Sequence, residues 1–118
     1  MSNVLASDLN KNTILIVDDT PNNLELLFKY LKNTGYKIFI AQNGKKALKI
    51  ASLVHIDLIL LDIMMPGIDG FETCRQFKHN SNIKDIPIIF MTALGETKNK
   101  VKGFEVGAVD YLTKPIDR

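Results

Sequence analysis

The chain has 118 residues, of which 46% are hydrophobic and 24% charged, and its formal net charge at pH 7 is +2. This length and composition fit one globular domain and exclude two ordinary ones. The near balance of charge and the scarcity of arginine argue against direct nucleic-acid binding. Cys74 is the single cysteine, and two histidines are too few to complete a structural zinc site with it. No apolar stretch approaches the roughly 20 residues of a membrane span, so we expect a cytoplasmic protein that does not bind membranes.

The chain divides into a polar N-terminal segment and one patterned domain. Residues 1–12 show no sustained periodicity and are expected to form a flexible tail, and residues 13–118 form the domain. Within the domain, short apolar runs alternate with amphipathic segments, which is typical of βα units. The expected strands are Thr13–Val17, Tyr36–Ala41, Leu58–Asp62, Ile86–Met91 and Val109–Thr113. The expected helices are Pro21–Asn33, Gly44–Val54, Phe71–His79 and Glu96–Val106.

The apolar runs predict how these strands are arranged. Ile14–Val17, Leu58–Leu61 and Ile88–Met91 are apolar throughout, as a parallel sheet covered by helices on both faces requires. The pattern therefore indicates a doubly wound α/β fold. Right-handed crossovers bring the C-terminal ends of all strands to one edge, where open α/β sheets bind their ligands.

Polar residues follow the apolar runs at this edge. Asp18 and Asp19 follow the first expected strand, Asp62 ends the third, Thr92 follows the fourth and Lys114 follows the fifth. Three carboxylates, a hydroxyl and an ammonium group are therefore expected to converge. An extended strand would direct Asp18 and Asp19 to opposite sides, which predicts that only one of them contacts a bound ion directly.

Each of these residues also has a structural interpretation. Asp19 or Thr20 could cap the helix that begins at Pro21. Thr92 could be an ordinary β-branched strand residue, and Lys114 an ordinary edge lysine. Asp62 is the hardest to explain in this way, because a carboxylate among aliphatic neighbours needs a buried partner.

The combination of groups indicates phosphoryl transfer. Carboxylates about 5 Å apart repel by roughly 3 kcal/mol at an effective dielectric constant near 20, so the cluster requires cations. Lys114 supplies one, and a hard divalent ion such as Mg²⁺ would supply the rest. Asp62 would then be the nucleophile that receives the phosphoryl group.

Four segments, ILIVDDTPNN, LILLDIMMPGIDG, IIFMTA and GAVDYLTKP, occur in this order from about Thr13 to Pro115. In sequence and spacing they resemble the receiver domain of two-component response regulators. The resemblance implies a flavodoxin-like, five-stranded parallel sheet of strand order 2-1-3-4-5. It also implies that Asp62 accepts a phosphoryl group from a sensor histidine kinase or a histidine phosphotransfer protein, and that the domain then switches conformation to control an output or a partner.

The same resemblance implies a Mg²⁺ site, in which Mn²⁺ can substitute. Asp19 and Asp62 would bind the ion directly, Asp18 through water, and Met64 through its backbone carbonyl. Met64 and Leu94 are apolar where many receivers carry polar side chains. We therefore expect slow self-dephosphorylation, because neither side chain can orient a water molecule.

The resemblance also assigns a switch. Lys114 would pair with Asp62 and later with a phosphoryl oxygen, Thr92 would move toward the phosphoryl group, and Tyr111 would turn inward. The peptide bond between Lys114 and Pro115 is expected to be cis.

Other functions of the same fold class fit less well. A flavin-binding module would need a phosphate loop after the first strand, where two aspartates would repel the phosphate. A phosphatase of the haloacid dehalogenase type places its nucleophile after the first strand. A degenerate receiver that only binds partners is a third alternative. The domain is not expected to be a turnover enzyme, although it would catalyse its own phosphorylation and dephosphorylation and could belong to a longer kinase or cyclase chain.

Three further residues are expected to have structural roles. Asp69 is predicted to cap the helix that follows it, His55 to be a loop or half-buried histidine, and Cys74 to be structural. The family's fifth helix has no counterpart after Pro115. This predicts a domain truncated after the fifth strand, either a fragment of a longer protein or a chain whose bare face is covered by a partner, such as a homodimer.

Overall fold

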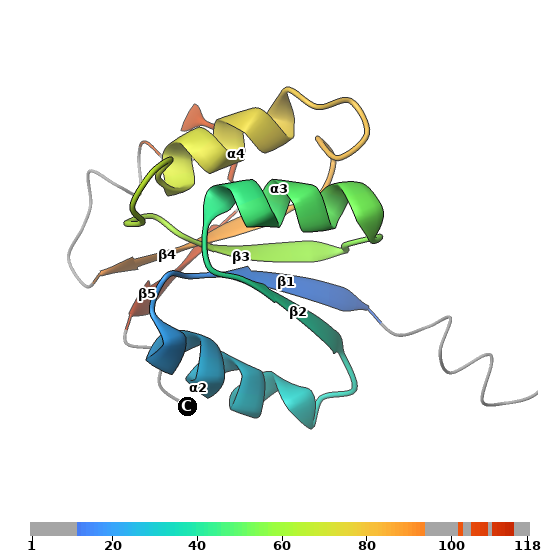
Figure 1. The fold of residues 1–118 in the computed structure, drawn as a ribbon, viewed down its shortest axis with the longest axis vertical. Coiled ribbons are helices and arrows are strands. Elements are labelled where there is room, and N and C mark those ends of the chain that lie inside the picture. The colour runs from blue at the N-terminus through green and yellow to red at the C-terminus, as the bar shows by residue number, and fades with distance from the viewer. Residues whose placement is uncertain (1–11, 94–101, 103–104, 109, 115–118) are drawn as a thin grey trace, which may run out of the picture.

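Five parallel strands form the sheet at the centre of the molecule (Figure 1). The computed structural model describes residues 12–93, 102, 105–108 and 110–114. The strands are β1 (Thr13–Val17), β2 (Lys37–Ala41), β3 (Leu58–Asp62), β4 (Ile88–Ala93) and β5 (Asp110–Lys114). Their order is β2-β1-β3-β4-β5, and every pairing is parallel. The predicted α/β fold and strand order are confirmed.

Helices cover both faces of the sheet. They are α2 (Pro21–Lys32), α3 (Gly44–Leu53) and α4 (Gly70–Lys78). Figure 1 shows α2 below the sheet and α3 and α4 above it, which is the predicted doubly wound arrangement. The helix expected over Glu96–Val106 and the tail expected over residues 1–12 lie largely outside the described residues. No helix in the part of the chain that the structure describes is long and apolar enough to span a membrane.

The core consists of one apolar cluster on each face. Leu15 and Val17 of β1 belong to the cluster beneath α3 and α4. Ile14 and Ile16 belong to the smaller cluster beneath α2. Alternate residues of one strand are thus buried on opposite faces, which explains why β1 is apolar at every position.

The expected boundaries of three strands are wrong. β2 begins at Lys37 rather than Tyr36, and β5 spans Asp110–Lys114 rather than Val109–Thr113. The largest difference is at β4. The fourth strand begins at Ile88 rather than Ile86, directly after Pro87, which has no N–H to donate to a ladder. It extends to Ala93, because Thr92 pairs with Thr113 and Ala93 with Lys114 of β5. The polar residue Thr92 therefore lies within β4 and does not mark its end.

The helix starts follow from local capping. The Asn43 side chain accepts a hydrogen bond of 2.9 Å from the Lys46 amide at the start of α3. The Asp69 side chain accepts one of 2.9 Å from the Glu72 amide at the start of α4, so the predicted capping role of Asp69 is confirmed. Both helices thereby begin at the edge of the sheet where the strands end.

Candidate functional site

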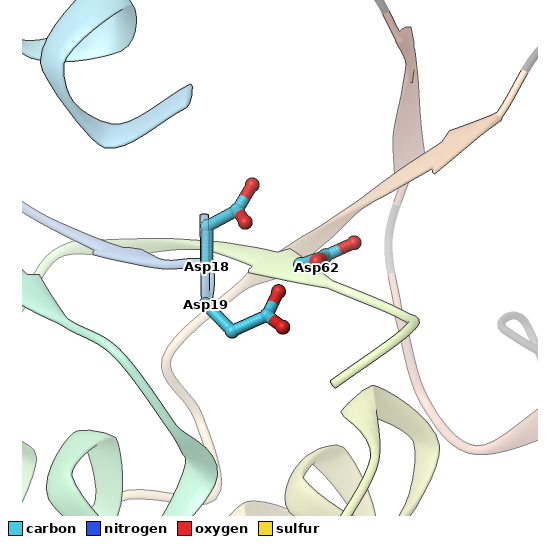
Figure 2. A group of neighbouring side chains, drawn as sticks. All are labelled: Asp18, Asp19 and Asp62. Carbon is cyan, nitrogen blue, oxygen red and sulfur yellow. The ribbon is translucent and has the colours of Figure 1, made fainter. Parts of the chain in front are cut away.

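Asp18, Asp19 and Asp62 lie together where β1 and β3 end (Figure 2). One carboxylate oxygen from each residue lies within 4.8 Å of the others. Among the residues that the structure describes, this is the one cluster of three or more acidic, histidine or cysteine side chains close enough to share a metal ion. The predicted convergence of three carboxylates is therefore present in the structure.

The chain turns immediately after β1, and this turn brings the neighbouring aspartates together. The Asp18 amide donates a hydrogen bond of 3.1 Å to the Ala41 carbonyl, which ends the β1–β2 ladder. Asp18 Oδ1 then accepts one of 2.9 Å from the Thr20 amide. The strand ends at Val17, so the condition under which Asp18 and Asp19 were expected to point to opposite sides does not apply beyond it. Each of the two residues brings a carboxylate oxygen within 4.8 Å of Asp62.

The same turn decides the capping alternative. Thr20 is the residue that precedes α2, but its side chain makes no capping hydrogen bond, and Asp19 is not at the capping position. Asp18 Oδ2 instead accepts a hydrogen bond of 3.2 Å from Asn23 Nδ2 in the first turn of α2. The N-terminus of α2 is thus tied to the acidic cluster through Asp18.

Asp62 is held by the tight loop between β3 and α4. Its side chain is 5% exposed, and Oδ1 lies 3.4 Å from the Met64 amide, which donates to it. The Gly70 amide donates a hydrogen bond of 2.8 Å to the Ile63 carbonyl. A Cβ atom on Gly70 would lie 2.3 Å from the Asp62 carbonyl oxygen, so only glycine allows α4 to begin this close to the cluster.

The electrostatics of the cluster favour a cation. Asp18 is fully buried and Asp62 almost so, whereas Asp19 is exposed to solvent. Burial weakens the screening of the repulsion between these carboxylates, and a divalent cation would relieve that repulsion. Oxygen ligands from carboxylates are those that Mg²⁺ prefers. The exposed Asp19 leaves the cluster open to ions and to a larger reactant.

The remaining predicted site residues follow from the register of the strands. Asp62 is paired with Met91 of β4, and Met91 with Leu112 of β5. Thr92 and Lys114 therefore lie one and two positions beyond this row, toward the same edge of the sheet. The side chains of Thr92, Lys114 and Tyr111 lie outside the described residues, as do Leu94 and Pro115.

Two contributors to the site were not anticipated as such. Asn23 binds Asp18, and Gly70 allows the close approach of α4. The motifs TPNN and GIDG contain these residues, but their contacts depend on how each loop folds back onto the strand ends.

His55 and Cys74 lie away from the cluster. His55 is in the loop before β3, as expected, and its Nε2 lies 2.8 Å from Asp57 Oδ1. The Cys74 side chain is fully buried in the core, and this burial raises the pKa of its thiol to about 11. A thiol in these surroundings remains protonated at neutral pH, in agreement with a structural role.

Comparison with known proteins identifies relatives over almost the whole chain. The family model described as "Response regulator receiver domain" matches residues 14–118. The transcriptional regulatory protein ResD of Bacillus subtilis is 47% identical over 107 residues, which are 91% of this chain and 43% of ResD. The response regulator PleD of Caulobacter vibrioides is 44% identical over 104 residues, 88% of this chain and 23% of PleD. The chain therefore spans less than half the length of these relatives.

Solved structures show the same relationship. The chemotaxis protein CheY4 of Vibrio cholerae has a TM-score of 0.85 and 31% identity, and the match covers 91% of this chain and 89% of CheY4. The receiver domain of a signal transduction histidine kinase from Syntrophus aciditrophicus has a TM-score of 0.81 and 39% identity, covering 90% of this chain and 80% of that one.

Proposed function

The chain belongs to the response regulator receiver domain family, and from this membership we propose that Asp62 accepts a phosphoryl group from a phosphohistidine donor. The observation that carries the proposal is the cluster of Asp18, Asp19 and Asp62, whose oxygens lie within 4.8 Å at the ends of β1 and β3. A purely partner-binding receiver gives no reason to keep two carboxylates buried side by side. The degenerate alternative is therefore not favoured.

The reaction uses the Asp62 carboxylate as the nucleophile. One of its oxygens attacks phosphorus, a P–O bond forms, and the P–N bond to the donor imidazole breaks, so that the imidazole leaves with the bonding electron pair. The Met64 amide, 3.4 Å from Oδ1, fixes the carboxylate in place for this attack. The exposed side of the cluster at Asp19 admits the donor.

The donor set fits Mg²⁺, with Asp19 and Asp62 as direct ligands and Asp18 acting through water. Two oxygens bound to one Mg²⁺ are at most about 4.2 Å apart, since each bond is about 2.1 Å. The three carboxylate oxygens lie within 4.8 Å of one another, which leaves room for a water between the ion and one of them. Asp18 is the residue least able to move, because Thr20 and Asn23 hold its two oxygens.

The backbone carbonyl of Met64 would complete the protein ligands, and Mn²⁺ could replace Mg²⁺. When bound, the ion supplies positive charge beside the oxygens of the transferred group. The groups of the chain itself do the rest: the Met64 amide holds Asp62 Oδ1, and the exposed Asp19 leaves the cluster open to the donor.

Lys114, Thr92 and Tyr111 are proposed to respond to the new charge. The ammonium group of Lys114 pairs with Asp62 and then with a phosphoryl oxygen, and the Thr92 hydroxyl donates to another. Tyr111 turns inward into the space that Thr92 leaves. The places of Thr92 and Lys114 support their roles, because both follow the row that pairs with Asp62, toward the edge of the sheet where the cluster lies. The added phosphoryl charge of about −2 supplies the driving force.

A sensor histidine kinase or a histidine phosphotransfer protein is the proposed donor. We propose a receiver over residues 13–118 with a flexible tail over 1–12, located in the cytoplasm, with no turnover reaction and no nucleic-acid contact of its own. Output would then come from another part of a longer protein or from a partner, which agrees with the chain spanning 43% of ResD and 23% of PleD. We also propose a homodimer through the sheet face beside α2.

Incubation with acetyl phosphate and Mg²⁺, followed by intact-mass measurement, tests the proposal. We expect the mass of one phosphoryl group to be added to the native protein and to the control Asp85→Asn, and none to Asp62→Ala. Labelling of Asp62→Ala to the native extent would place the acceptor elsewhere and contradict the proposal.

The phosphorylated state is proposed to be long-lived because Met64 cannot orient water. Its side chain is 74% exposed, so Met64→Asn can be made without disturbing the core. We expect this variant to lose the phosphoryl group faster, whereas Leu53→Asn, also at a 74% exposed residue, should not. Loss of the label from the native protein within seconds would contradict slow self-dephosphorylation.

A further inference from the structure

A groove of about 590 Å³ lies at the opposite edge of the sheet from the aspartate cluster. It is formed by the end of α3, the loop between α3 and β3, and the segment between α4 and β4. In Figure 1 these segments lie on the right, where the strands begin, whereas the aspartates lie where β1 and β3 end. Phosphoryl transfer at Asp62 does not use this groove.

The floor of the groove is apolar. Ile56 and Ile83 line it and are 2% and 5% exposed, so they are already fixed in the core. Leu53 lines it as well but is 74% exposed, so its apolar surface is available for contact with a ligand in the groove. An aliphatic side chain laid across Leu53 would remove this apolar surface from water.

The walls are held in place without a ligand. Lys78 Nζ donates hydrogen bonds of 3.0 Å to the carbonyls of Lys84 and Ile86, which fixes the segment after α4. On the other wall, Asp57 Oδ2 accepts a hydrogen bond of 2.8 Å from the Thr13 amide. The groove is therefore preformed, and binding requires little reordering of the chain.

The ionisable residues that line the groove are two aspartates and one histidine. Asp57 and Asp85 line it, and no lysine or arginine is among its lining residues. His55 is beside Asp57 and adds a second polar group at the rim. The carbonyl end of α3 also points to this edge, and the last turn of α3 contains no basic residue to neutralise it. Lys78 is not among the lining residues, and its ammonium group donates hydrogen bonds to the carbonyls of Lys84 and Ile86.

We propose that this groove docks a basic segment of a partner protein, in which an arginine is flanked by aliphatic residues. The guanidinium group pairs with Asp85 and the carbonyl end of α3, and the aliphatic neighbour packs on Leu53. Arginine fits better than lysine because its planar fork can bind a carboxylate and carbonyl oxygens at the same time. This proposal does not depend on phosphorylation of Asp62.

The test is a titration of the ¹⁵N-labelled protein with short peptides, followed by NMR in saturating Mg²⁺. The probe is an acetylated and amidated tetrapeptide of leucine, arginine, leucine and glycine, and the matched probe has citrulline in place of arginine. We expect amide shifts at His55, Asp85 and Ile86, and binding roughly two- to fivefold weaker for citrulline, the range of an exposed ion pair. Asp85→Asn should weaken the arginine peptide by a similar factor, whereas Glu25→Gln, on the opposite face of the sheet, should not.

Other outcomes overturn the proposal. Equal binding of the arginine and citrulline peptides would show that charge plays no part. Shifts confined to Asp18, Asp19 and Asp62 would show that the peptide binds the other acidic site. If agmatine alone binds as tightly as the peptide, the groove is a small-cation site and not a protein-docking surface. Loss of binding in Leu53→Ser, with the fold intact, would support the apolar contact, and unchanged binding would contradict it.

Discussion

Replacing Asp62 by asparagine should stabilise the metal-free protein. Two unit charges at the 4.8 Å spread of the cluster repel by about 3.5 kcal/mol at an effective dielectric constant near 20. Each charge is shared between two oxygens, Asp19 is hydrated, and Lys114 is proposed to offset part of the repulsion. We therefore expect a net gain of roughly 1 kcal/mol, which for a domain of about 100 residues raises the Tm by roughly 4–8 °C. An asparagine oxygen can still accept the hydrogen bond from Met64, so the loop after β3 should be retained.

Thermal melts in EDTA and in increasing Mg²⁺ provide the assay. Mg²⁺ should stabilise the native protein by mass action. At a Mg²⁺ concentration of one hundred times the Kd, the free energy of unfolding should rise by about 2.7 kcal/mol, and the Tm should rise with it. Asp62→Asn should begin higher in EDTA and respond less to Mg²⁺. Asp85→Asn, which removes an exposed charge at the other edge of the sheet, should melt like the native protein in both conditions. A native melt insensitive to Mg²⁺, together with an Asp62→Asn variant destabilised in EDTA, would refute the reasoning.

Three further predictions concern stability and reactivity. Gly70→Ala should destabilise the fold by about 1–3 kcal/mol in denaturant melts and reduce the Mg²⁺ response, because its Cβ would meet the Asp62 carbonyl oxygen at 2.3 Å. Gly67→Ala, whose Cβ meets nothing within 4 Å, should cost only the strain of its positive φ, roughly 1–2 kcal/mol. The hydrogen bond from the Thr13 amide, and then His55, lower the pKa of Asp57, so its contribution to stability is present above about pH 4 and is lost as pH falls through the lowered pKa. Asp57→Asn should thus be less stable than the native protein at pH 7 and should converge with it below pH 4, and a constant difference across this range would contradict the assignment. Cys74 should not react with iodoacetamide in the native protein and should react once denaturant unfolds it, and rapid native-state labelling would be inconsistent with its burial.

Most of the fold could be predicted because β1 and β3, at the centre of the sheet, are buried on both faces. β1 and β3 have the predicted boundaries, since both are apolar runs that end at an aspartate. The prediction failed at β4, where a polar residue was taken as the end of the strand. Thr92 remains in the ladder because β5 supplies a partner for it, and pairing between strands distant in sequence is not visible in a local pattern.

The site was predictable to the extent that topology alone determines it. Residues that follow parallel strands meet at one edge whatever their side chains do, so Asp18, Asp19 and Asp62 could be placed together before their geometry was known. The direction of each side chain could not be predicted, because it depends on the turn after Val17. In that turn Asp18 binds Thr20 and Asn23, and this hydrogen bonding leaves both Asp18 and Asp19 close to Asp62.

The groove, unlike the aspartate cluster, could not be predicted from the sequence. Its lining comes from residues 51–57 and 80–87, two segments with no shared motif, and they meet only because α3 and α4 pack side by side on the same face. The charge that each edge of the sheet favours follows from the direction of the helices. α2, α3 and α4 each follow a strand that ends at the aspartate edge, so their N-termini lie there, and the C-termini of α3 and α4 lie at the groove. Helix dipoles therefore favour negative groups, including a phosphoryl group, at the first edge and positive groups at the second. If both proposals hold, the parallel topology alone explains why an anion is received at one edge and a basic segment at the other.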